Sequence, residues 1–215
     1  LLITGAGGFL GSRICEYYSN RDGYEAVGVT HRELDIEDFV AVSAFVKAIR
    51  PDYVLHCAAI SNTGACERNP VLSEKVNVRG TVNLAKACRK AGSRMIFTSS
   101  DQIYNTSHSL EPNREGSEGK PGNVYGRDKK RAEEAMLTYL PDAVALRLTW
   151  MYDAPSRGRA AGQGLLQKLA DALKDRREVE FPVHDYRGIT YVWEVVRHLE
   201  EAMGLPGGVY NFGSE

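Results

Sequence analysis

The sequence predicts an α/β fold in which a doubly wound parallel sheet carries helices on both faces, with a small C-terminal lobe. Short apolar runs alternate with longer stretches of helical periodicity, and this alternation starts at the first residue. Strands that are separated by helices run parallel with right-handed crossovers, so the helices cover both faces of the sheet. Glycine and proline fall at the ends of the helical stretches, where they end helices.

Five apolar segments are expected to form the strands, at residues 1–4, 25–29, 53–56, 94–98 and 143–148. Helices are expected between them, at residues 8–20, 38–50, 70–91 and 123–140. Pro51 and Pro141 stop the second and fourth helices, and Gly92 follows the end of the third. Residues 1–153 are therefore expected to form one domain, interrupted by a loop at 105–122 that is rich in Ser, Gly, Glu and Pro.

The alternation breaks after residue 153. Residues 154–164 are rich in Gly, Arg and Ala; helices are expected at 165–175 and 191–203, and a strand-like run follows at 209–212. We expect residues 154–215 to be mostly lobe elements that return to the carboxyl edge of the sheet. Ser214 is a suitable N-cap for a further helix, so the chain is expected to continue on its C-terminal side.

Composition narrows the function classes. The chain has 215 residues, 43% hydrophobic and 26% charged, with a net charge of −1. This balance does not favour nucleic acid or an anionic membrane as a partner, and no apolar run is long enough to cross a bilayer. The four cysteines have no CxxC spacing and the histidines no metal-ligand spacing, so we expect a cytoplasmic protein with reduced thiols and no metal.

A glycine loop joins the first strand to its helix. Gly5 suits a tight turn, Gly8 lets the backbone approach a pyrophosphate, and Gly11 lets the helix pack close to the strand. The helix start at Phe9 and Leu10 offers unpaired N–H groups and a positive dipole to the phosphates. The spacing is GxxGxxG, which also occurs in ordinary glycine-rich turns; between a strand and a helix it favours a Rossmann-like dinucleotide-binding domain at residues 1–153.

The end of the second strand distinguishes the two nicotinamide dinucleotides. An acid there binds the ribose 2′-hydroxyl, whereas a basic residue favours a 2′-phosphate. His31 and Arg32 stand at this point, so NADP(H) is favoured, while Glu33 nearby keeps NAD(H) open. Asp35 and Ile36 are expected beside the adenine.

Tyr125 and Lys129 are four residues apart in an expected helix, so they share a face. A nearby ammonium favours the phenolate, so Lys129 is expected to lower the pKa of Tyr125 and make it a proton donor or acceptor. Ser100, at the end of the fourth strand, can hydrogen-bond the reacting oxygen. A YxxxK pair without other motifs is usually a surface contact. Together with the glycine loop and Ser100, the pair favours a catalytic role.

These motifs together resemble the extended short-chain dehydrogenase/reductase family. The resemblance runs through nearly the whole chain and is closest to the dTDP-4-dehydrorhamnose reductases and related sugar-nucleotide-binding proteins. It rests on the glycine loop and on Leu34-Asp35-Ile36-Glu37-Asp38, Arg50-Pro51-Asp52-Tyr53-Val54, His56-Cys57-Ala58-Ala59, Asn77-Val78 with Gly80-Thr81, Ser99-Ser100-Asp101, Asn123-Val124-Tyr125-Gly126-Arg127 with Lys129, and Arg147-Leu148-Thr149-Trp150-Met151-Tyr152.

The resemblance implies reduction of a 4-keto sugar nucleotide by a nicotinamide cofactor, with Tyr125 as the proton donor. Ser100, Tyr125 and Lys129 would be the catalytic residues, and Asn77 would support them through its side-chain amide. The residues then expected at the cofactor are Gly5, Gly8, Phe9, Leu10, Gly11, His31, Arg32, Asp35, Ile36, Cys57, Ala58, Ala59, Thr98, Tyr125 and Lys129. The residues expected at the substrate are Ser61, Gln102 and Trp150.

Two other functions stay open. Related dehydratases use a glutamate where Gln102 stands, and a neutral amide cannot abstract a proton, so dehydration is disfavoured. Epimerases use the same tyrosine and lysine but keep NAD tightly bound. The absence of an acid directly after the second strand is a mild argument against NAD, and so against an epimerase. Some relatives bind NADP and act as regulatory subunits of another enzyme. A homodimer is a further expectation that is left open.

Overall fold

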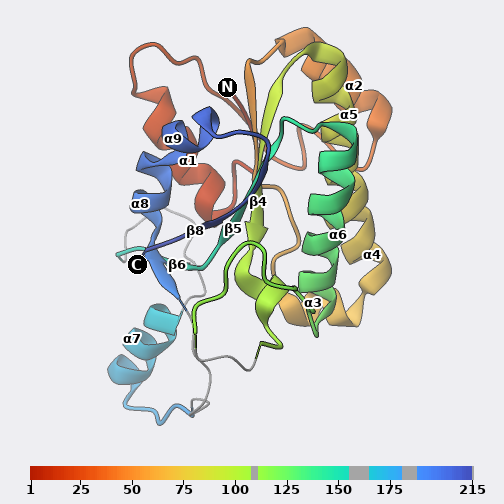
Figure 1. The fold of residues 1–215 in the computed structure, drawn as a ribbon. Coiled ribbons are helices and arrows are strands. Elements are labelled where there is room, and N and C mark those ends of the chain that lie inside the picture. The colour runs from red at the N-terminus through yellow and green to blue at the C-terminus, as the bar shows by residue number, and fades with distance from the viewer. Residues whose placement is uncertain (108–110, 155–164, 181–187, 215) are drawn as a thin grey trace.

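The computed structural model describes residues 1–107, 111–154, 165–180 and 188–214. Its main sheet has six parallel strands in the order β2-β1-β3-β4-β5-β8, which confirms the predicted α/β class (Figure 1). Their bounds are β1 (Leu2–Thr4), β2 (Val27–Val29), β3 (Tyr53–His56), β4 (Arg94–Ser100), β5 (Val144–Leu148) and β8 (Gly208–Phe212). The order reverses between β1 and β3, and in open α/β sheets ligands bind at the carboxyl side of such a switch point.

Helices cover both faces of this sheet. In Figure 1, α1 (Phe9–Ser19), α8 (Val192–Arg197) and α9 (Leu199–Gly204) lie on one side, and α2 (Phe39–Ile49), α5 (Thr81–Ala91) and α6 (Val124–Tyr139) on the other. Each face buries its own apolar cluster: Ile3, Leu55 and Ile96 point to the α1 side, and Leu2, Val54 and Phe97 to the α2 side. Alternate residues of a strand face opposite ways, which explains why these strands are apolar throughout.

The long helix expected at 70–91 is present but not regular. It consists of α4 (Pro70–Glu74), a π-helical turn η1 (Lys75–Gly80) and α5. Gly80 packs against Ile36, where a Cβ would lie 2.6 Å from the Ile36 Cδ1 atom. A π-helical turn inserts an extra residue into the helix and often marks a functional site. A short helix before it, α3 (Thr63–Arg68), was not expected from the sequence.

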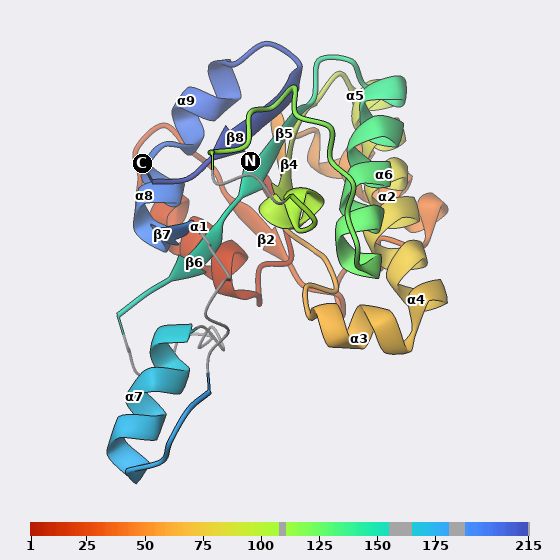
Figure 2. The same cartoon turned by 60° about the horizontal axis from the view of Figure 1, so that its bottom comes forward.

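The later elements divide between two places. A second sheet has two parallel strands, β6 (Trp150–Tyr152) and β7 (Ile189–Tyr191), and α7 (Leu165–Asp175) projects from the body (Figure 2). By contrast, α8 contacts α1, and β8 pairs with β5 in the main sheet. The guanidinium of Arg94 in β4 donates to the carbonyls of Met203 and Leu205, which ties the end of α9 to the sheet. The expected boundary at residue 153 stays a prediction.

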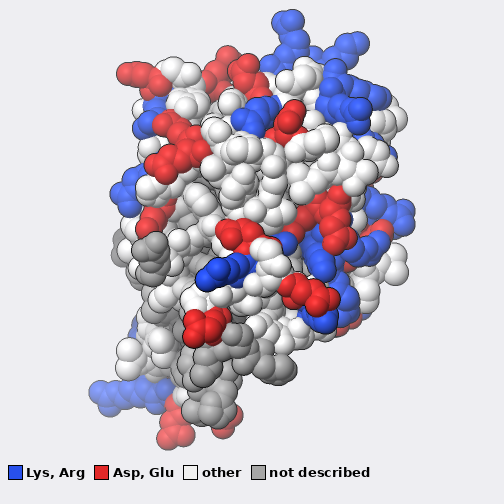
Figure 3. Space-filling view, viewed as in Figure 1, with Lys and Arg blue, Asp and Glu red and all other residues white. Residues whose placement is uncertain are grey.

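The described surface carries both signs of charge. In Figure 3, acidic and basic side chains are interspersed over the face shown, with Lys and Arg gathered near its upper right. Within the described ranges, no helix has the length and apolar character needed to cross a membrane. Cys66 and Cys88 are buried, Cys15 and Cys57 are half-buried, and all four are free thiols.

Helix α2 offers a test of how local chemistry stabilises this fold. The carboxylate of its N-cap, Asp38, accepts hydrogen bonds from Val40 N at 2.8 Å and Ala41 N at 3.1 Å. We expect Asp38→Ala to lower the free energy of unfolding by about 1 kcal/mol, because two N–H groups lose their partner. Urea unfolding measures the change.

Asp38→Ser provides the control because a serine can still cap, and most of the stability should return. Glu37→Ala removes a neighbouring acid that caps nothing in the described structure, and it should have little effect. Equal losses for Asp38→Ala and Asp38→Ser would contradict the capping role.

Candidate active site

The glycine turn after β1 lies against the end of β3, at the switch point of the sheet. Gly5 has φ +71°, and a Cβ there would lie 2.7 Å from the backbone nitrogen of Ala58. A Cβ at Gly11 would lie 2.2 Å from the carbonyl oxygen of Gly5. Only glycine permits this double approach, so the roles predicted for Gly5 and Gly11 have a steric basis in the structure.

Gly8 is the N-cap of α1, and in the described chain no side chain caps this helix. The first N–H groups of α1, around Phe9, Leu10 and Gly11, are therefore available to an anion. Leu10 is buried in the core, so it can meet a ligand only through its backbone. The ring of Phe9 is half-buried under the Arg13 guanidinium, whose carbon lies 4.0 Å from the ring centroid.

The end of β3 is fixed by a buried chain of hydrogen bonds through His56. The Thr81 hydroxyl donates to the Asn77 carbonyl at 2.7 Å, so it must accept from His56 Nε2 at 3.0 Å. His56 Nδ1 then accepts from the Thr4 hydroxyl at 2.8 Å, which in turn accepts from Ala58 N at 3.4 Å. Burial lowers the pKa of His56 to about 3, so the ring is neutral and holds one tautomer.

These hydrogen bonds through His56 position the residues that are predicted to line the cofactor. Ala58 and Ala59 are half-buried next to the glycine turn, and Cys57 N donates to the Thr4 carbonyl at 3.2 Å. In β4 the Thr98 hydroxyl donates to the His56 carbonyl at 3.0 Å. Cys57, Ala58 and Ala59 directly follow β3, and Thr98 lies in the adjacent strand β4, so the four residues gather at the carboxyl edge of the sheet.

Ser100, Tyr125 and Lys129 meet at the same edge. Ser100 ends β4, and Tyr125 and Lys129 lie in the first turns of α6, which begins at the N-cap Asn123. The Ser100 side chain lies near enough to Tyr125 to lower the pKa of its phenol. Lys129 is buried; its ammonium donates to the Thr98 carbonyl at 2.7 Å and lies 5.7 Å from the centroid of the Tyr125 ring.

The electrostatics of the pair differ from the sequence-based expectation. Burial raises the pKa of Tyr125, and the neighbouring Ser100 side chain opposes this rise. Burial also lowers the pKa of Lys129 to about 8, opposed by the charges of Cys57 and Glu133. The expectation that Lys129 acidifies the phenol is therefore wrong for this structure, because burial of the hydroxyl dominates the shift.

The basic residues at the end of β2 are exposed to solvent, where a ligand can reach them. The side chain of His31 is 79% exposed and Arg32 is exposed, so both basic groups are accessible. The Glu33 carboxylate folds back and accepts from Thr30 N at 2.7 Å and from the Thr30 hydroxyl at 2.8 Å, which lowers its pKa. Asp35 is half-exposed, whereas Ile36 is buried against Gly80.

The residues predicted for the substrate lie on three separate elements. Ser61 is exposed in the segment between β3 and α3. The Gln102 side-chain oxygen accepts from Asn123 Nδ2 at 3.0 Å, which links the 3₁₀ turn η2 (Asp101–Tyr104) to the start of α6. Trp150 is 37% exposed in β6.

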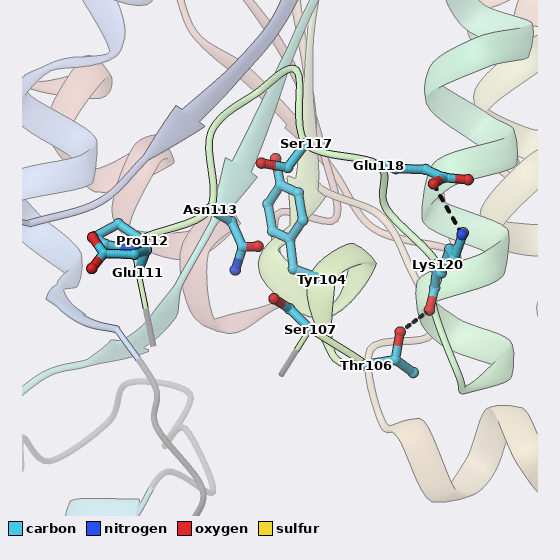
Figure 4. Close-up of a pocket in the computed structure, with 9 residues that line it drawn as sticks. All are labelled: Tyr104, Thr106, Ser107, Glu111, Pro112, Asn113, Ser117, Glu118 and Lys120. Atoms are coloured by element: carbon cyan, nitrogen blue, oxygen red, sulfur yellow. Dashed lines mark hydrogen bonds and ion pairs between the residues drawn. The ribbon is translucent and has the colours of Figure 1, made fainter. Parts of the chain in front are cut away.

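A pocket of about 270 Å³ lies beside this edge, within the connection from β4 to α6 (Figure 4). The ring of Tyr104 stands among the loop residues that line it, with Asn113 and Ser117 close by in the view. Its polar lining is Tyr104, Thr106, Ser107, Glu111, Asn113, Ser117, Glu118 and Lys120. Sequence reasoning identified this connection as a loop next to the active-site strand but singled out none of these residues.

Two buried networks support the site, and most of their members were not predicted from the sequence. Asn77, in the π-helical turn, accepts from Ile60 N at 2.8 Å and donates to the Ile60 carbonyl at 3.1 Å, which fixes the segment after Ala59. Glu133 and Arg147 form a bidentate ion pair behind Lys129. Lys129 and Glu133 are spaced i, i+4, and Arg147 is a lone charge in an apolar strand; these two signals could have predicted the pair.

Among the residues that the structure describes, no three His, Cys, Asp or Glu side chains are grouped so that they could hold a metal ion.

Comparisons with known proteins show the family to which the chain belongs. The sequence profile of the family described as "RmlD substrate binding domain" matches residues 1–204. The dTDP-4-dehydrorhamnose reductase of Mycolicibacterium smegmatis is 34% identical over 181 residues, which are 80% of this chain and 54% of that protein. The methionine adenosyltransferase 2 subunit beta of Xenopus laevis is 31% identical over 194 residues, covering 85% of this chain and 58% of that protein.

Solved structures show the same fold. The dTDP-4-dehydrorhamnose reductase of Bacillus anthracis in complex with NADP has a TM-score of 0.91 at 24% identity, covering 100% of this chain and 74% of that one. The UDP-glucose 4-epimerase of Thermotoga maritima with UDP-glucose has a TM-score of 0.86 at 25% identity, covering 99% and 76%.

The chain spans little more than half the length of the curated relatives named above. The family profile, in contrast, covers almost all of this chain, from the glycine loop to the end of α9. The chain therefore belongs to the RmlD substrate binding domain family, within the extended short-chain dehydrogenase/reductases.

Proposed function

We propose that this chain carries the cofactor and catalytic residues of an NADP(H)-dependent reductase of a 4-keto sugar nucleotide. The observation that supports this most directly is the meeting of Ser100, Tyr125 and Lys129 beside the glycine turn, at the carboxyl edge of one sheet. Its kinship to the Mycolicibacterium smegmatis dTDP-4-dehydrorhamnose reductase gives the substrate class.

The residues present fit a dinucleotide. The glycine turn and the uncapped start of α1 suit a pyrophosphate, and Ala58, Ala59 and Thr98 leave a small-residue edge beside it. When bound, the nicotinamide supplies the hydride. The chain's own residues supply the rest: Ser100 hydrogen-bonds the substrate oxygen, and Tyr125 gives it a proton.

The raised pKa of Tyr125 suits the direction of reduction. A phenol that is protonated at neutral pH can act at once as a general acid, whereas oxidation of an alcohol would need the phenolate. Once Tyr125 has given up its proton, Lys129 is the buried cation beside its ring, with the ammonium 5.7 Å from the ring centroid. The substrate oxygen accepts from Ser100 in both states.

NADP(H) is the proposed cofactor, with NAD(H) as the alternative. Arg32 and His31 are exposed at the end of β2 and can meet a 2′-phosphate, whereas Glu33 is engaged by Thr30. NADP is also the nucleotide bound in the Bacillus anthracis reductase, which has the same fold.

Two other functions have specific support. An NAD-dependent epimerase is favoured by the structural likeness to the Thermotoga maritima UDP-glucose 4-epimerase. A non-catalytic, NADP-binding regulatory subunit is favoured by the similarity to methionine adenosyltransferase 2 subunit beta. A homodimer is proposed with any of the three, and light scattering of the intact protein measures its mass.

One experiment separates the three functions. The intact protein is mixed with NADPH and a panel of nucleotide-linked keto sugars, and absorbance at the nicotinamide wavelength is followed. A reductase consumes NADPH only when a keto sugar is present. An epimerase leaves NADPH unchanged but interconverts UDP-glucose and its 4-epimer in a parallel reaction with NAD, which chromatography of the sugar nucleotides detects. A regulatory subunit binds NADPH and changes neither the absorbance nor the sugar nucleotides.

Tyr125→Phe removes the proposed proton donor and little else. We expect kcat to fall by about a hundredfold or more, because general acid catalysis is lost. The affinity for NADPH, measured by fluorescence titration, should change less than about twofold, since the ring is kept. A variant with wild-type kcat would remove Tyr125 from the mechanism.

Arg32→Ala tests the cofactor preference. If the guanidinium meets the 2′-phosphate, NADPH binding should weaken by about tenfold, the worth of a charged hydrogen bond, while NADH binding stays nearly constant. Calorimetric titration of both nucleotides gives the ratio. Arg50→Ala, at the far end of α2, is a matched control; equal weakening of NADPH and NADH by Arg32→Ala would reject the phosphate contact.

A further inference from the structure

A buried network connects the catalytic helix with the loop that lines the pocket. Both oxygens of the Glu133 carboxylate accept from Arg147, at 3.0 Å from Nε and 2.7 Å from Nη2. The Ser99 hydroxyl, next to Ser100 in β4, donates to the same carboxylate at 2.5 Å. Both charged side chains are less than one-tenth exposed, so the pair is shielded from solvent.

Beyond Arg147 the network reaches three consecutive carbonyls of the loop. Arg147 Nη1 donates to the Glu115 carbonyl at 3.3 Å and to the Tyr104 hydroxyl. The Tyr104 hydroxyl has one proton, for which the Arg114 carbonyl at 3.2 Å and Asn211 Oδ1 at 3.0 Å compete. Asn211 Nδ2 in β8 donates to the Asn113 carbonyl at 2.9 Å.

The loop also accepts a hydrogen bond from strand β8. The Glu115 carboxylate accepts from Asn211 N at 2.9 Å, and this bond lowers the pKa of Glu115. Residues 113–115 are therefore held by β5, β8 and η2 together, although they belong to none of these elements. Water could satisfy the carbonyls of a surface loop without a buried ion pair, and burying charges has a desolvation cost. The use of a buried ion pair to hold this loop therefore needs a functional explanation.

The place of the loop supplies that explanation. It connects Ser100, at the end of β4, to Tyr125, in the first turn of α6, and Tyr104, Asn113 and Ser117 line its pocket (Figure 4). On the other side of Glu133, one turn away on α6, lies Lys129, whose charge interacts with this carboxylate. The same ion pair thus adjoins the catalytic lysine and the pocket wall.

We propose that Glu133, Arg147 and Tyr104 form a clamp that fixes loop residues 113–117 as a wall of the substrate site. This inference rests on the proposed function, since it assigns the pocket to the sugar nucleotide. The three are positioning residues: they determine how well the substrate binds, and they leave the dinucleotide site at β1 and β3 unaffected. Loops held by a rigid scaffold are the usual carriers of substrate specificity.

Tyr104→Phe is the sharpest test, because it removes the linking hydroxyl and keeps the ring. In the intact protein we expect KM for the keto sugar nucleotide to rise about five- to tenfold, as for the loss of a hydrogen bond, with kcat and NADPH affinity within about twofold. Hydrogen exchange of the peptide covering 113–117 should accelerate. Tyr139→Phe makes the same chemical change at the exposed end of α6 and should alter none of these quantities.

Asn211→Ala is a second variant, which leaves the ion pair intact and removes the hydrogen bond to the Asn113 carbonyl. The same rise in KM is expected, so this variant tests the clamp if Tyr104→Phe does not fold. Wild-type protein without turnover of any keto sugar nucleotide would reject the proposed function itself. If the wild type is active, a KM within about twofold of wild type in both variants overturns the clamp. An equal loss of NADPH affinity also overturns it, because the effect would then be general.

Discussion

Burying the ammonium of Lys129 is the constraint from which most of the site follows. A charged group that leaves water must find new partners. Lys129 bonds the Thr98 carbonyl, lies 4.5 Å from the centroid of the Phe97 ring, and has the Glu133 carboxylate one turn further along α6. Glu133 is itself buried and therefore requires Arg147, which in turn requires the Tyr104 hydroxyl and the Glu115 carbonyl. Charge compensation thus extends from Lys129 to the pocket loop.

Most of the fold could be predicted from the sequence, because alternating periodicity and helix-ending Gly and Pro act locally. The five predicted strands and four predicted helices of the sheet are present, with ends shifted by a few residues. The misses have physical reasons. Helix α3 is too short to show a period, and the π-helical turn at Lys75–Gly80 lies inside a stretch whose sequence pattern is helical throughout. The place of β8 beside β5 depends on a tertiary contact that no local pattern reveals.

The site was less predictable than the fold. The glycines, Ser100, Tyr125 and Lys129 could be picked out because their types and spacing are restricted. The direction of the Tyr125 pKa could not, because the sequence shows that an ammonium is near but not that the phenol is buried. Likewise Arg147 and Asn211 come from β5 and β8, 64 residues apart by number, and only strand pairing brings them together with Glu115.

The two halves of the site are held in different ways, and this difference bears on how the family diversifies. The dinucleotide side depends on backbone contacts: Gly5 against Ala58 and Gly11 against Gly5 leave no room for a side chain. The pocket side depends on side chains, namely Tyr104, Arg147 and Asn211, that hold a loop of irregular structure. Substitution is sterically forbidden in the first half and tolerated in the second as long as the buried charges stay paired. Differences within the family are therefore expected in the loop between β4 and α6 rather than at the glycine turn.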